Sequence, residues 1–100
     1  MPSLTYYVDH SSRPCSNGST YAANLRRYHH FVASNRFTLG SRLTLTSRAG
    51  RRVSVVVADR IGHGTDVDAD AGTFRALAGP RYRLIGRLTV RVHLASGRRQ

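Results

Sequence analysis

Three aspartates are the residues of this chain best suited to acid–base chemistry. Asp66 and Asp68 stand two residues apart in a segment predicted to be a β-strand, so their side chains are expected on one face, opposite Val67. Repulsion between two close carboxylates would raise the pKa of one of them. A carboxyl group with a raised pKa can donate a proton to an oxygen whose bond is breaking. Asp68 is therefore the preferred proton donor, with Asp59 as its partner.

Some of these acidic and polar residues also have ordinary structural explanations. Asp59 stands beside Arg60 and could form an ion pair in a loop. Asp70 precedes a helical segment and is better explained as its N-cap than as a catalyst. His63 lies between two glycines and could reach a ligand from a loop, although a simple turn is the more common role for such a residue. Both interpretations stay open at this point.

A metal site or a cofactor is not expected. Cys15 is the single cysteine, so the chain has no intramolecular disulfide and no Cys-x-x-Cys pair. His29 and His30 are adjacent, and adjacent side chains point apart in most backbones. The stability of the fold must therefore come from packing.

The charge is strongly one-sided. The chain has 16 basic residues, all arginine, and 5 acidic residues, all aspartate, which gives a net charge of +11. Such a surface favours anionic partners, among them nucleic acid, wall polymers, acidic lipids and acidic protein faces. The sequence contains no recognition helix, zinc finger or aromatic ribonucleoprotein strand, so sequence-specific nucleic-acid binding is not expected. Codon bias and function both remain open as reasons for the arginine content.

Hydrophobic periodicity predicts a mainly β chain. Apolar and polar residues alternate over 42–46, 52–57 and 87–94, and the turn between the first two contains Gly50. Residues 4–8 predict another strand, and 20–23 a short one. Residues 25–34 fit both a helical stripe and a surface loop. One short helix is predicted over 71–78, capped by Asp70 and ended by Gly79 and Pro80.

These elements suggest a small barrel, because a closed barrel removes exposed sheet edges. A chain of 100 residues fits one domain, over 1–100. Its first residues lack the pattern of a signal peptide, and no segment has the length and apolar character of a membrane span. The sequence therefore predicts a soluble protein without an export signal.

Four ordered motifs resemble the rare lipoprotein A and expansin-type double-psi β-barrel family. They are FTLGSRLTL at 37–45, VSVVVADR at 53–60, DVD at 66–68 and TFRALAG at 73–79, followed by VRV at 90–92. The order and spacing match across roughly 33–94. The resemblance implies a six-stranded double-psi β-barrel with one short helix.

The same resemblance implies a site in one shallow groove. Residues matching Asp59 and Asp68 line that groove in the family and are implicated in glycan cleavage or in non-hydrolytic wall loosening. Tyr7 corresponds to a position that usually faces the groove. The chain differs from the family's "D-R-G-P" after Arg60, and it has Ser34 and Asn35 where many wall-cleaving members carry a histidine. The expected substrate-binding residues are Tyr7, Ser34, Asn35, Arg60 and His63.

The function expected from the resemblance is directed at peptidoglycan, with cleavage of the lytic transglycosylase type by Asp68, Asp59 and Asp66. Without a signal peptide, such a protein would be delivered to the wall by another route, for instance as a phage component. The alternative is a non-catalytic structural subunit of a phage tail or other assembly, whose barrel docks acidic protein neighbours. Whether identical chains form an oligomer is left open.

Overall fold

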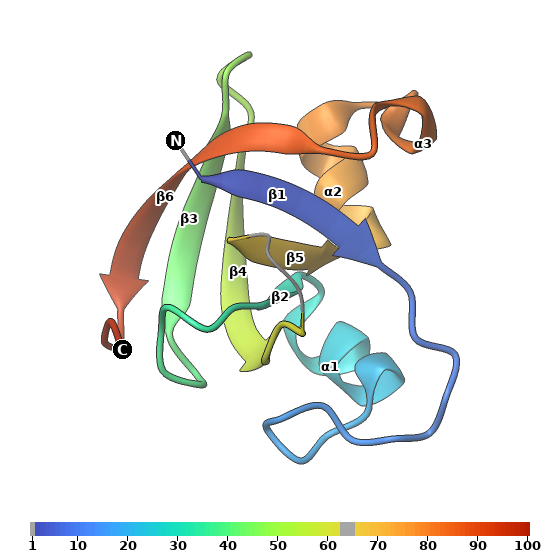
Figure 1. Cartoon of the computed structure of the whole chain (residues 1–100), viewed down its shortest axis with the longest axis vertical. Coiled ribbons are helices and arrows are strands. Elements are labelled where there is room, and N and C mark those ends of the chain that lie inside the picture. The colour runs from blue at the N-terminus through green and yellow to red at the C-terminus, as the bar shows by residue number, and fades with distance from the viewer. Residues whose placement is uncertain (1, 63–65) are drawn as a thin grey trace.

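Six strands close into one barrel in a computed structural model that describes residues 2–62 and 66–100. The order of strands around the barrel is β1-β5-β2-β4-β3-β6. Figure 1 shows β3 and β4 running upright, β6 crossing from α3 over the barrel before it descends beside β3, and β1 and β5 next to α2. The strands are β1 (Ser3–Tyr7), β2 (Phe31–Ala33), β3 (Arg42–Ser47), β4 (Arg52–Asp59), β5 (Val67–Asp70) and β6 (Leu88–Ser96).

The strands predicted from alternating residues are confirmed. The turn between β3 and β4 closes with a hydrogen bond from Ser47 N to Arg51 O of 2.8 Å. Gly50 adopts a φ of 88° there, in the left-handed region that glycine enters without steric cost. The expected mainly β barrel is therefore present, and its strands begin and end close to the predicted positions.

The described residues form more helices than the single one predicted from the sequence. Helix α2 (Ala71–Ala78) occupies the predicted range, and Asp70 caps it by accepting a hydrogen bond from Thr73 N. Two further helices are present, α1 (Tyr21–Tyr28) and α3 (Tyr82–Ile85). The short strand predicted over 20–23 is wrong, because Thr20 is the N-cap of α1 and accepts from Ala23 N. The hydroxyl of Thr20 satisfies a main-chain N–H of the first turn, which stabilises a helix at this position.

Two hydrophobic cores lie on opposite sides of the barrel wall. The first fills the barrel, where α2 contributes Phe74 and Leu77. The second lies outside the wall, where Cys15 and Tyr21 pack against Phe31 and Ala58. The apolar residues that fill the barrel include Leu4, Val32, Leu43, Leu45, Val55, Val57, Val67, Ala69 and Val90. Side chains that point away from this interior therefore form the outer face on which the predicted acids lie.

Candidate functional site

The register of four strands places two of the predicted acids on the same outer wall. Asp68 on β5 pairs with Thr5 on β1 and with Ala33 on β2. Ala33 also pairs with Asp59 on β4. Directly paired residues project on the same side of a sheet, so Thr5, Asp68, Ala33 and Asp59 form one row. Two strand spacings separate Asp68 from Asp59, which puts their Cα atoms about 10 Å apart.

A register shift in the sheet brings Asp59 into this row. Phe31 pairs with Val56 and Val32 with Val57, but Ala33 pairs with Asp59, so Ala58 is skipped. A shift of this kind re-aims the side chain that follows it. Asp59 consequently lies within reach of Tyr7, whose hydroxyl donates to Asp59 Oδ2 at 3.2 Å.

Asp59 also holds the segment between β1 and α1 against the barrel. Its Oδ1 accepts hydrogen bonds from Ser16 N and Ser16 Oγ, each at 2.9 Å. The same oxygen accepts from Arg60 N at 2.9 Å. Both oxygens of Asp59 are therefore engaged by the chain itself, and the loop ion pair suggested for Asp59 and Arg60 is replaced by a main-chain contact.

Asp68 is more enclosed than Asp59. Its side chain is 6% exposed, and its Oδ1 accepts from Thr5 Oγ1 at 2.7 Å. Asp66 lies just before β5, on the side of Ser3, whose main-chain N–H donates to it at 3.1 Å. Asp66 also forms an ion pair with Arg36 at 2.7 Å. Asp66 is therefore outside the row across the wall. The acids of that row are Asp68 and Asp59.

The predicted substrate-binding residues around the row make contacts that shape its edge. Ser34 is fully buried, and its hydroxyl accepts from Arg36 N. The guanidinium of Arg60 donates to the carbonyls of Ser34 and Phe37. Asn35 is exposed, and its side-chain amide donates to Ile61 O and accepts from Ile61 N. His63 lies outside the described residues. The ligand-binding roles of these residues remain predictions.

The whole barrel is similar to a solved structure, cerato-platanin 3 from M. perniciosa, with a TM-score of 0.72. The two chains share 18% sequence identity, and the similarity covers 95% of this chain and 93% of that one. The fold is the double-psi β-barrel. No family model matches this chain, and no curated protein matches it by sequence. The finer resemblance to the rare lipoprotein A family stays a prediction.

Two findings on this double-psi barrel bear on ligands and membranes. Within 2–62 and 66–100, no three histidine, cysteine or aspartate side chains gather in an arrangement that could hold a metal ion. None of the helices in the same part of the chain is long and apolar enough to cross a membrane.

Tyrosine side chains of the outer wall are held in their protonated form. Burial raises the pKa of Tyr7 far above its ordinary range, and the nearby Asp59 and Cys15 raise it further. Burial also raises the pKa of Tyr21 to about 12, with a further contribution from Asp70. The hydroxyl of Tyr21 donates to the carbonyl of Tyr7 at 2.9 Å. Both phenols are therefore hydrogen-bond donors over the neutral pH range.

Alkaline pH is expected to destabilise the barrel through these two tyrosines. In the unfolded chain a phenol ionises near pH 10, whereas the folded protein still holds the proton of Tyr21 up to about pH 12. The unfolded state then binds fewer protons, so the contribution of Tyr21 is complete below about pH 10 and is lost as the pH rises through about 12. Urea titrations at several pH values measure this loss.

The double variant Tyr7→Phe and Tyr21→Phe is expected to show a shallower fall of unfolding free energy above pH 10. Phenylalanine does not titrate, so the proton difference between the folded and unfolded states becomes smaller. An unchanged pH dependence in this variant would contradict the burial of the two phenols.

Two partners of the acids were missed at the level of sequence. Thr5 alternates with Tyr7 in the first predicted strand, so period-two spacing could have placed it on the same face. Ser16 lies in a loop rich in serine, proline and glycine, where no local pattern indicates a contact with Asp59. Only the packing of that loop on the barrel reveals it.

Proposed function

We propose that this double-psi barrel binds glycan strands of peptidoglycan along its outer wall and cleaves them with Asp68 as the general acid. The observation that carries the proposal is the strand register that sets Asp68 and Asp59 on either side of Ala33. Ala33 has the smallest side chain that a chiral residue can carry, and it is buried between the two acids. Tyr7 adds a phenol that donates to Asp59.

The reaction follows the lytic transglycosylase pattern. Protonated Asp68 gives its proton to the glycosidic oxygen as the bond from that oxygen to the sugar carbon breaks. A hydroxyl of the same sugar adds to that carbon and closes an anhydro ring, and its proton returns to Asp68. Water is not consumed, so a single acid in the right place is sufficient. Thr5 positions Asp68 through its hydrogen bond.

The test is digestion of purified peptidoglycan that has been stripped of attached phosphate polymers. We expect anhydro-sugar products from the natural chain and a loss of about 10²-fold or more in Asp68→Asn, the range typical of a removed general acid. Asp9→Asn is the matched control, because Asp9 lies in the loop after β1 and accepts from Ser11 N. Products from Asp68→Asn at the natural rate would assign the chemistry elsewhere.

Binding and cleavage are separated by a sedimentation assay with the same stripped peptidoglycan. Asp68→Asn is expected to sediment with the polymer as the natural chain does, since the amide keeps the shape of the carboxyl group. A natural chain that sediments but yields no anhydro sugar at high protein concentration would remove the enzymatic part. Failure to sediment at all would remove glycan binding as well.

A second candidate is a non-catalytic docking module in a larger assembly, such as a phage virion. The hydrogen bonds that Asp59 accepts from Tyr7, Ser16 and Arg60 favour it, because they give that acid a structural role. Size-exclusion chromatography with light scattering tests this candidate. A stable monomer that never co-purifies with particles would count against it.

A further inference from the structure

The aspartates that belong to strands lie on one side of the barrel. Asp59 is the last residue of β4, and Asp70 is the last residue of β5. Asp68 lies on the outer side of β5, paired with Ala33. In the closed order β1-β5-β2-β4-β3-β6, strands β3 and β6 stand across the barrel from β5 and β2. The wall of β3 and β6 carries arginines and threonines instead. These two strands carry Arg42 and Arg91 and no aspartate.

Three open pockets adjoin one another along that basic wall. The first, of about 470 Å³, is lined by Arg48, Arg51 and Arg87 above an apolar floor that includes Leu77 and Leu88. The second, of about 360 Å³, shares Arg48 with the first and adds Arg91. The third, of about 380 Å³, shares Arg91 with the second. Neighbouring pockets share lining residues, and we call the three pockets together the arginine track.

The register of the sheet fixes the spacing of charges in the arginine track. Thr46 on β3 pairs with Arg52 on β4 and with Arg91 on β6, so an arginine stands on each side of a hydroxyl. Thr44, two residues earlier on the same face of β3, pairs with His93 on β6 and with Ser54 on β4. Successive outward residues on a strand are about 6.7 Å apart, twice the rise per residue. The track therefore sets two arginines, Arg52 and Arg91, beside the hydroxyl of Thr46.

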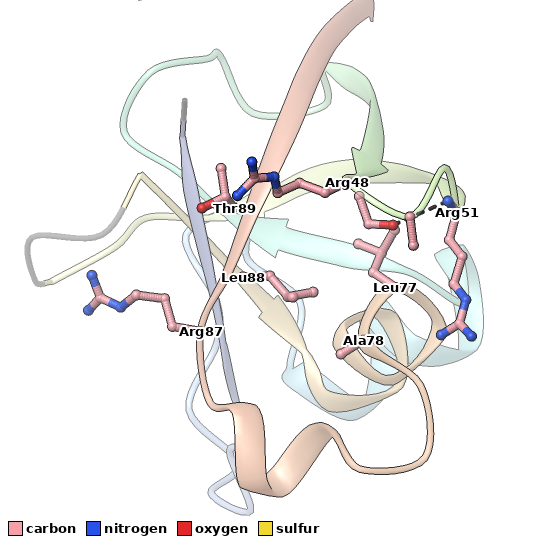
Figure 2. A pocket seen from close by; sticks show the side chains of 9 residues that line it. Arg48, Arg51, Leu77, Ala78, Arg87, Leu88 and Thr89 are labelled. Atoms are coloured by element: carbon pink, nitrogen blue, oxygen red, sulfur yellow. Dashed lines mark hydrogen bonds between the residues drawn. The ribbon is translucent and has the colours of Figure 1, made fainter.

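Figure 2 shows how side chains lie at one end of the track. Arg48 extends from the β3–β4 turn toward Thr89, and Arg51 points along the end of α2. Arg87 points away from the other lining side chains. Within the described part of the chain, no aspartate pairs with an arginine that lines these pockets. Arg48, Arg52 and Arg91 are exposed and are available to an anionic ligand.

We propose that the arginine track binds a single linear phosphodiester chain of the polyol phosphate kind. Guanidinium groups match phosphate oxygens in bidentate geometry, and the threonine hydroxyls add further donors. A linear polymer that carries a negative charge in every repeat unit offers a phosphate to each of Arg48, Arg52 and Arg91. His93 is the one ring that lines the three pockets, so the track lacks the stacking platforms on which bases of single-stranded nucleic acid are held.

This inference goes beyond the proposed glycan site and does not depend on it. The track uses β3, the start of β4 and β6, whereas the acid row uses β1, β5, β2 and the end of β4. A protein that fails to cleave peptidoglycan could still bind the phosphodiester chain, and the reverse also holds.

The experiment measures binding of a fluorescent poly(glycerol phosphate) oligomer by anisotropy at several salt concentrations. Arg91→Gln is expected to weaken binding by roughly tenfold, because it removes charge-assisted hydrogen bonds shared by two pockets. The slope of log K against log salt should fall by about one. Arg26→Gln is the matched control: it removes the same charge from the exposed end of α1, and we expect a change of about twofold or less.

Three outcomes would overturn the proposal. Equal weakening in Arg26→Gln and Arg91→Gln would mean that net charge alone drives binding. Equal affinity for polyglutamate of the same charge would mean that phosphate is not recognised. Tighter binding of single-stranded DNA than of poly(glycerol phosphate) would assign the groove to nucleic acid. Circular dichroism of both variants checks that the fold is retained, as expected for exposed side chains.

Discussion

Replacing Asp70 by alanine is expected to lower the free energy of unfolding by about 3 kcal/mol, a large part of the stability of a domain of this size. The side chain is 1% exposed and serves two elements at once. It caps α2 through Thr73 N and accepts from Phe31 N of β2 at 3.1 Å. Loss of a cap costs about 1 kcal/mol, and a buried N–H without an acceptor costs a further 1–3 kcal/mol.

Thr20→Ala is the control for the capping part of this effect. Thr20 caps α1 through one hydrogen bond to Ala23 N, so its removal should cost only about 1 kcal/mol. Urea denaturation of both variants gives the two values. Equal losses would show that the contact of Asp70 with β2 adds nothing, contrary to the hydrogen bond between Asp70 and Phe31.

Gly97→Ala is expected to destabilise the protein by about 3 kcal/mol, through a close approach between the end of β6 and the start of β3. A Cβ atom at Gly97 would clash with Ser41 Oγ and would lie 2.7 Å from Ser41 Cα. Main-chain atoms cannot yield as a flexible side chain can, and overpacking of this kind costs about 1–3 kcal/mol. Gly97 also has a φ of 101°, where an L-residue pays about 1–2 kcal/mol more.

Gly40→Ala separates these two causes. Gly40 has a φ of 87°, and a Cβ atom there would meet nothing within 4 Å. Its substitution therefore reports the backbone cost alone, which is about 1–2 kcal/mol. If both alanine variants lose the same stability in urea, the contact between Gly97 and Ser41 is not as tight as the structure has it.

The C-terminal segment gives the Gly97 variant a second readout. Arg98 N donates to Ser41 Oγ, and Arg98 O accepts from Thr38 N at 2.9 Å. Gln100 N donates to Arg36 O at 2.7 Å. Displacement of Gly97 would release these contacts, so faster hydrogen exchange at Thr38 N is expected in Gly97→Ala and not in Gly40→Ala.

Local patterns in the sequence determined several elements of this protein. Period-two alternation predicted β3, β4 and β6, because side chains on a strand alternate between core and solvent. The start of α2 was predicted from its N-cap Asp70, and its end from Gly79 and Pro80. Both signals act within one turn of the helix, so they can be read from local sequence. The ordered motifs indicated the double-psi barrel, and the similarity to a solved structure confirms that fold.

Tertiary structure alone decided how the chemical groups meet. Thr5 and Asp68 are 63 residues apart in sequence and become neighbours only when β1 pairs with β5. The shift that aligns Asp59 with Ala33 depends on how two strands fit in a closed barrel, and no local periodicity encodes it. The arginines of the track likewise come together from a turn and two strands. Sequence patterns specify which way each side chain faces, whereas the choice of neighbouring strands depends on packing the whole core.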